Sequence, residues 1–225
     1  QHLEAMLKDL PQLDRQEKAD LFFNEGEKFY QQRDFARALL EYRKAQIANP
    51  HYVRAHIRAG DIYCLQSQYY EAIDQYKVVT KQEPGRGDIW IRLILQYRYT
   101  YRGTNQEQMY RNQIERYRAQ VAENPSNAML HFVLGMCELL LPLKEPRGQA
   151  KARSLREFAT AVELDPDCLW GYWGQKYAHL FMGEDLTAPA LEAATAACAE
   201  ARKRSYGDLR ARDILDAFRA AAKKQ

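Results

Sequence analysis

The sequence lacks several features that would assign it to a familiar functional class. Its longest uncharged, apolar-rich run lies at residues 128–137, far short of the roughly 20 residues that a membrane-spanning helix needs. The four cysteines (Cys64, Cys137, Cys168 and Cys198) form no C-x-x-C pair, which argues against a zinc site or a disulfide framework. Lys and Arg total 33 against 30 Asp and Glu, so no overall charge favours nucleic acid or an anionic membrane.

Signatures of common enzymes are missing as well. No H-E-x-x-H, G-x-S-x-G, Walker or G-x-G-x-x-G string occurs, and the five histidines are scattered. The sequence ELDPD at residues 163–167 gathers three carboxylates, but Asp and Pro are expected there for turn chemistry. We therefore predict a non-catalytic protein with no metal site and no cofactor.

The start of the chain carries no intact targeting signal. The first residue is Gln1, and residues 1–10 have neither a basic start nor a long apolar centre, so we expect an excised domain or a processed form. The one Asn-x-Ser triplet, at Asn124, contains a proline and is not a glycosylation acceptor, which favours a non-glycosylating location such as the cytoplasm. The compartment itself stays open.

What the sequence does contain is an internal repeat. Four prolines are spaced by 34, 41 and 41 residues, and an aromatic residue stands eight residues before each of them. These prolines are Pro50, Pro84, Pro125 and Pro166, and the aromatics are Tyr42, Tyr76, Tyr117 and Phe158. The first two aromatics also follow a glycine by sixteen residues. Small residues at fixed places allow two helices to approach closely, aromatics fill the space between helices, and proline ends the second helix.

Residues 22–50 and 56–84 resemble the tetratricopeptide (TPR) repeat family, whose unit of 34 residues is a pair of antiparallel helices. The family pattern maps to Phe22, Gly26, Phe29, Ala38, Tyr42, Ala45 and Pro50 in the first copy. The second copy has His56, Gly60, Tyr63, Ala72, Tyr76 and Pro84, with Val79 where alanine is usual. His56 and His131 share a repeat position at which packing is expected.

The resemblance implies an all-α fold: a right-handed α-solenoid of about five antiparallel helix pairs, a TPR-like superhelix. We expect an N-terminal helix or cap at 1–18, with its helix at about residues 3–10, a repeat domain at 19–205, and a C-terminal capping helix at 206–225. The repeats are placed at about 19–52, 53–86, 87–127, 128–168 and 169–205.

The third and fourth repeats are each seven residues longer than the standard unit. The third has Ile94 in place of the glycine, and we expect longer helices around a turn at residues 103–105. Its first helix is predicted to continue through Arg102, with Tyr97 and Tyr101 packed inward. In the fourth, residues 142–149 contain two prolines and a glycine and are predicted to form a loop.

The concave groove of such a stack is lined by the first helix of each pair, and here it carries a stripe of arginines. The predicted peptide-binding residues are Arg54, Ile57, Arg58, Ile91, Arg92, Leu95, Arg98, Tyr99 and Arg102. Guanidinium groups suit carboxylates, so a peptide or helix with acidic and apolar side chains would fit. Two alternatives stay open: Asp61 and Asp88 neutralise the arginines within the groove, or the stripe binds nucleic acid, which the net charge does not favour.

The first helix of the fourth repeat is apolar nearly all round. Its predicted groove side includes Met129, Phe132, Val133, Met136 and Leu140. A helix of this kind is either buried by the rest of the protein or forms a hydrophobic contact with a partner, including a second copy in a homodimer.

From these features we predict a protein–protein interaction scaffold or adaptor that binds a peptide or helix of another protein. Two alternatives are an assembly or biogenesis factor of bacterial envelope machinery, and a regulatory TPR domain of a larger enzyme or signalling protein. The identity of the partner, the pathway and the oligomeric state do not follow from the sequence.

Overall fold

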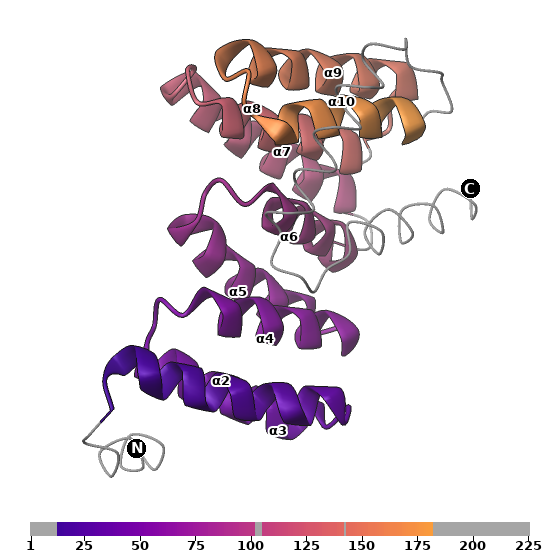
Figure 1. Ribbon diagram of the computed structural model, residues 1–225. Helices are drawn as coiled ribbons and strands as arrows, with labels where there is room; N and C mark the ends of the chain where they lie inside the picture. Colours follow the sequence, from indigo (N-terminus) through magenta and orange to yellow (C-terminus); the bar gives the residue numbers. More distant parts are fainter. Residues whose placement is uncertain (1–12, 102–104, 142, 182–225) are drawn as a thin grey trace. The chain divides into compact units, whose positions relative to one another are not determined.

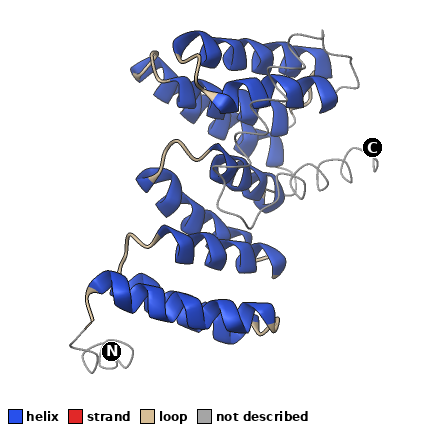
Figure 2. Cartoon of the chain, viewed as in Figure 1, coloured by secondary structure: helices blue, strands red, loops and turns tan. Residues whose placement is uncertain are grey.

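The computed structural model describes residues 13–101, 105–141 and 143–181. The described residues are helices joined by short connections and contain no strand, which confirms the all-α prediction (Figure 2). The chain divides into two compact units, residues 1–100 and 101–225. The predicted N-terminal helix, the second helix of the fifth repeat and the C-terminal capping helix lie outside the described residues.

The first unit contains five of the described helices (Figure 1). They are α2 (Arg15–Gln31), α3 (Phe35–Ala48), α4 (Val53–Leu65), α5 (Tyr69–Gln82) and α6 (Gly87–Thr100). Helix α2 packs against α3 and α4 packs against α5, while α3 contacts α4 and α5 contacts α6. Each helix is therefore in contact with its neighbour in the sequence, as a stack of helix pairs requires.

The second unit contains the other four described helices. They are α7 (Gln106–Glu123), α8 (Ala128–Leu140), α9 (Arg147–Leu164) and α10 (Leu169–Phe181). Helix α8 contacts α7, α9 and α10, and α9 also contacts α10. The most apolar helix of the sequence is thus the central helix of this unit.

The four repeated prolines follow helix ends, as the sequence predicts. Helices α3, α5, α7 and α9 each end two residues before a proline, with Asn49, Glu83, Asn124 or Asp165 as the C-cap residue. Several helices begin at a polar cap: Asp14 forms a capping box with Glu17, and the side chain of Asn127 accepts hydrogen bonds from the first backbone N–H groups of α8.

The repeated glycines face the repeated aromatics. A Cβ atom added to Gly26 would lie 2.5 Å from Cε1 of Tyr42, and one added to Gly60 would lie 2.6 Å from Cε1 of Tyr76. In the second unit Gly135 meets Phe158 in the same way, at 2.6 Å. The aromatic ring of the second helix therefore lies against the bare backbone of the first, and this contact sets the distance between the helices of a pair.

The seven extra residues of the longer repeats are divided between a helix and a connection. Helices α7 and α9 each have 18 residues, whereas α3 and α5 have 14. Helix α6 ends at Thr100, so the predicted continuation through Arg102 is wrong, and Arg102 lies outside the described residues. Residues 143–146 form a loop as predicted, but α9 already begins at Arg147, because the proline at 146 stands at the N-cap, where its missing N–H is not needed.

Two turns place a non-glycine residue in the left-handed region. Arg33 has φ 59° and Ser67 has φ 60°. The backbone N–H of Ser67 donates to the carbonyl of Cys64, and that of Gln68 donates to the carbonyl of Tyr63, which is the Schellman pattern of helix termination. Glycine is the usual residue at this position, since other L-residues are strained there.

We expect Gly60→Ala to destabilise the protein by about 1–3 kcal/mol, because the added methyl overlaps the ring of Tyr76. Helix propensity alone would favour alanine by about 1 kcal/mol, so the sign of the effect is diagnostic. Urea denaturation followed by circular dichroism measures it. The matched control is Gly148→Ala in α9, where an added Cβ meets nothing within 4 Å and stability should hold or rise. Equal or higher stability of Gly60→Ala would contradict the close contact.

We expect Ser67→Gly to stabilise the protein by about 0.5–1 kcal/mol, because glycine adopts the left-handed conformation without strain. The same denaturation measurement applies. Ser67→Ala is the control, since alanine keeps the strain and should bring no gain. A gain of the same size for alanine would show that backbone conformation is not the cause.

Candidate functional site

The predicted groove residues of the first unit lie on α4 and α6. Consecutive first helices are connected across this face by a repeated arrangement of three polar side chains, which we call the carboxylate ladder. Each rung contains an acid, a tyrosine from the second helix of the same repeat, and an arginine from the first helix of the next repeat.

The first rung is centred on Glu27 of α2. The hydroxyl of Tyr42 donates to Glu27 Oε1 at 2.5 Å. Arg58 of α4 donates to both oxygens of the same carboxylate, from Nε at 2.9 Å and from Nη2 at 2.8 Å. The guanidinium of Arg58 also lies 4.9 Å from the ring centroid of Tyr30. A bidentate pair of this kind fixes both the spacing and the rotation of the two helices.

The second rung repeats this geometry one unit later. Tyr76 donates to Asp61 Oδ1 at 2.8 Å, and Nη1 of Arg92 donates to the same oxygen at 2.6 Å. The tyrosine again lies 15 residues after the acid and the arginine 31 residues after it, as in the first rung. The ladder is therefore a property of the repeat rather than of one site.

Burial and the neighbouring charges together determine the protonation of the ladder. Burial, and then the hydrogen bond to Glu27, raises the pKa of Tyr42, and burial followed by the charge of Asp61 holds the pKa of Tyr76 well above its ordinary value. Burial alone would lower the pKa of Arg92, but the negative charge of Asp61 raises it. Both phenols therefore remain neutral donors and the guanidinium remains charged.

The ladder changes the interpretation of the arginine stripe. Arg58 and Arg92 are buried, with 8% and 7% of their surface exposed, and both are held in ion pairs. Neutralisation within the groove, one of the alternatives, therefore applies to these two arginines. Asp61 pairs with Arg92, and the charge of Asp88 also raises the pKa of Arg92, although the ion pair of Asp88 is with Arg86 at 2.7 Å. Arg58 pairs with Glu27, a partner that was not predicted.

The other predicted groove residues differ in accessibility. Arg54 is exposed and its guanidinium lies 4.2 Å from the ring centroid of Phe23. Tyr99 is exposed as well, and its ring lies 5.6 Å from that of Tyr69. Ile57, Leu95 and Arg98 are half-buried, while Ile91 is fully buried and belongs to the core.

Two exposed apolar side chains stand on either side of the turn between α4 and α5. Leu65 is 63% exposed at the end of α4, and Tyr70 is 68% exposed at the start of α5. Tyr69, next to Tyr70 in the sequence, has its ring in contact with that of Tyr99. The tyrosine pair directly after a helix-ending turn is the sequence signal that could have drawn attention to Tyr69 and Tyr70.

The apolar helix of the fourth repeat is a core element. Phe132, Val133, Met136 and Leu140 are fully buried, and Met129 is half-buried. The Phe132 ring lies 6.0 Å from Phe158 of α9 and 5.8 Å from Trp170 of α10. Of the two predicted alternatives, burial within the protein is therefore the one that applies. For Phe132, Val133, Met136 and Leu140 the predicted contact with a partner or a second copy is wrong, because these side chains are not accessible.

The described residues contain no group of three or more His, Cys, Asp or Glu side chains arranged to hold a metal ion. His56 and His131 instead have structural contacts, each with Nε2 close to a proline carbonyl six residues earlier in the chain, at 3.1 and 2.9 Å. Within the same described ranges, every helix is too short or too polar to cross a membrane.

Several solved structures resemble this chain. YrrB, described as a TPR protein with an unusual peptide-binding site, is 16% identical, with 100% of this chain and 99% of that chain covered and a TM-score of 0.42. TTC0263, a thermophilic TPR protein of Thermus thermophilus, is 18% identical over 92% of this chain and 100% of its own, with a TM-score of 0.46. MamA from Desulfovibrio magneticus RS-1, residue 41 to its end, is 16% identical over 84% and 98%, with a TM-score of 0.40.

No protein-family model matches the sequence, and no curated protein does. YrrB and TTC0263 are TPR proteins, the family that the sequence resembles.

We expect Asp61→Ala to lower the free energy of unfolding by about 3–5 kcal/mol, because it leaves the buried Arg92 guanidinium and the Tyr76 hydroxyl without their acceptor. Adding Arg92→Met should recover much of this loss, since no uncompensated charge then remains. Urea denaturation of the two single variants and the double variant gives the coupling energy. The control is Lys28→Met, which removes an exposed pair with Glu25 and should change stability by less than about 1 kcal/mol. Additive losses in the double variant would refute the ladder.

Proposed function

We propose that the chain is a non-catalytic protein-interaction scaffold that binds a peptide or helix of another protein along the first helices of the first unit. The observation that carries this proposal is the combination of a rigid ladder with accessible side chains next to it. The ladder neutralises its own charges, so the contacts left for a partner are the cationic and apolar groups around it.

Within this proposal the predicted residues take two different roles. Arg58 and Arg92 position the helices, because they are buried and paired. Arg54 and Tyr99 contact the partner directly, since both are exposed on α4 and α6. Ile57, Leu95 and Arg98 complete the contact surface, and Leu65 extends it at the end of α4.

The chemistry of these side chains favours a partner with acidic and apolar residues. Arg54 offers a guanidinium to a carboxylate, in an arrangement supported by the Phe23 ring beneath it. The aromatic pair of Tyr69 and Tyr99 offers two tilted rings with little conformational freedom to lose. Aromatic and arginine side chains are also the types that contribute most to binding energy at protein interfaces.

We expect peptides selected on the purified chain from a displayed random library to be enriched in acidic and apolar residues. The double variant Arg54→Glu/Tyr99→Ala should bind the selected peptides at least about tenfold more weakly, because it removes the guanidinium and the aromatic surface together. Isothermal titration calorimetry with synthetic peptides measures the affinities, and circular dichroism verifies that the variant is folded.

The matched control is Arg43→Glu, which reverses an exposed charge on α3. It should leave the affinity unchanged, because α3 is the second helix of its pair. Selection of basic peptides, or equal binding by the double variant, would overturn the proposal. Hydrogen exchange adds a positional test: bound peptide should protect α4 and α6 more than α3.

A further inference from the structure

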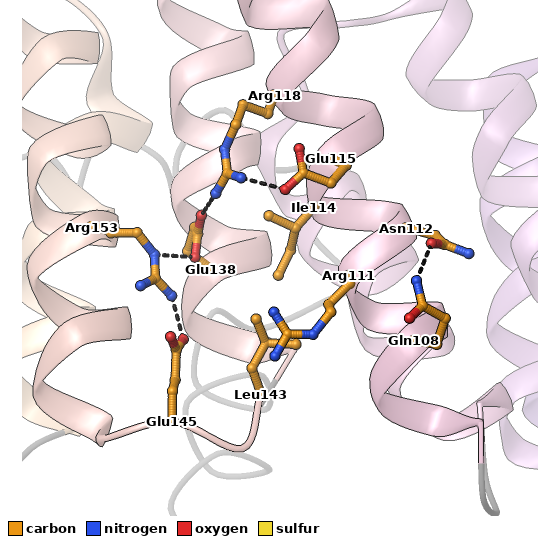
Figure 3. Close-up of a pocket in the computed structure, with 10 residues that line it drawn as sticks. All are labelled: Gln108, Arg111, Asn112, Ile114, Glu115, Arg118, Glu138, Leu143, Glu145 and Arg153. Carbon is orange, nitrogen blue, oxygen red and sulfur yellow. Dashed lines mark hydrogen bonds and ion pairs between the residues drawn. The ribbon is translucent and has the colours of Figure 1, made fainter.

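A polar cleft of about 350 Å³ opens in the second unit, where α7, the end of α8 and the start of α9 meet (Figure 3). Its volume lies within the range of about 300–1,000 Å³ typical of small-ligand sites. The cleft contains three arginines and three glutamates together with two apolar residues, Ile114 and Leu143. None of these was a candidate site residue in the sequence.

Glu138 is the buried centre of the cleft. It lies three residues after Gly135, where the other glycine-containing repeats have the aromatics Phe29, Tyr63 and Tyr177. Only 3% of its surface is exposed. A carboxylate has therefore replaced a packing residue.

Two arginines from the flanking helices bind this carboxylate. Arg118 of α7 donates to Glu138 Oε1 at 2.6 Å, and Arg153 of α9 donates to Glu138 Oε2 at 2.7 Å. Figure 3 shows both guanidinium groups pointing toward Glu138, Arg118 from above and Arg153 from the left. Arg118 also bonds Glu115, and Arg153 also bonds Glu145, so five alternating charges form one network.

Stability alone does not account for this network. Replacing a buried ion pair or triad by apolar residues of similar volume is often neutral or stabilising, so a buried Glu138 is weak evidence for a stabilising role. Departures from a repeat's own packing pattern are expected where a protein has a function to perform. Glu138 is such a departure.

Both long repeats contribute to the walls of the cleft. The first turns of α7, which has four more residues than α3 or α5, supply Gln108, Arg111 and Asn112. The connection between α8 and α9 supplies Leu143 and Glu145. The seven-residue extensions thus coincide with the cleft.

We propose that this cleft binds a short peptide segment in which a carboxylate side chain lies next to an apolar one. The arginine side chains of the cleft have N–H donors to spare, which favours a ligand that accepts hydrogen bonds. Arg111, Arg118 and Arg153 each have five N–H donors, and their bonds to carboxylates use one, two and two of them. Glu138, by contrast, already accepts at both oxygens.

Arg111 is the residue placed to bind the ligand carboxylate first. Its side chain is 49% exposed, and its described carboxylate partner is Glu107, one helical turn away. Such a surface pair contributes little to stability, so the guanidinium turns readily to a ligand. Figure 3 shows Arg111 beside Leu143, with Ile114 nearby, and these two side chains form the apolar part of the cleft.

The test uses capped tripeptides titrated into the full chain and followed by nuclear magnetic resonance of the arginine Nε–H and backbone amide signals. The probes are acetyl-Leu-Glu-Leu-amide, its Gln counterpart and its Lys counterpart. The Glu peptide is expected to shift the signals of α7 and α9 at millimolar concentration, and the Gln peptide to bind at least about tenfold more weakly. Preference for the Lys peptide, or no shift with any probe, would overturn the proposal.

Arg111→Gln is the decisive variant, since it removes a half-exposed donor without touching the buried network. It should abolish the preference for Glu over Gln, and the folded spectrum should be retained. The matched control is Arg116→Gln, an exposed arginine of α7 that does not line the cleft and should leave binding unchanged. Unaltered Glu preference in Arg111→Gln would contradict the assignment. This proposal does not rest on the groove of the first unit, so Arg54→Glu/Tyr99→Ala should bind the Glu tripeptide normally.

Discussion

The first unit depends on a partly buried carboxylate that is held by two buried donors. Glu27 and Asp61 each connect a helix pair internally, through a tyrosine, and to the next pair, through an arginine. Leaving any one of these groups unpaired is costly in a low-dielectric interior, so the three must occur together. The position of one helix pair on the next is therefore set by specific arginine–carboxylate bonds as well as by apolar contacts.

Close packing supplies the complementary constraint within a pair. The ring of Tyr76 lies against the backbone of Gly60, and the same ring carries the hydroxyl that binds Asp61. One side chain therefore sets the distance between two helices and also orients the carboxylate that reaches the next pair. This double role explains why a tyrosine stands at this place in both repeats of the first unit, whereas Phe158 in the second unit has no hydroxyl and contacts only apolar groups and glycine backbone among the contacts described.

The sequence could predict the helix pairs because their signals are local. Glycine, aromatic and proline recur at fixed spacing, and each acts within about one helical turn or against one neighbour. The partners of Arg58 and Arg92 are 31 residues away and depend on side-chain reach, so periodicity could place both arginines on first helices but could not show that each is held in an ion pair. The predicted end of α6 was wrong for a related reason. Seven residues are about two helical turns, so the inward face of the helix stays the same whether the insertion lengthens one helix or is divided between a helix and a connection.

The same chemistry has opposite consequences in the two units. In the ladder a partly buried acid binds one arginine and one neutral tyrosine, and both guanidinium groups are buried. At Glu138 the acid binds two arginines, of which Arg118 has a side chain 46% exposed. An enclosed network of ion pairs holds helices in position. A network whose outer side chains reach solvent can exchange a bound water or a weak surface ion pair for a ligand. Exposure of the guanidinium, more than the presence of the ion pair, therefore separates a positioning arginine from one available for recognition.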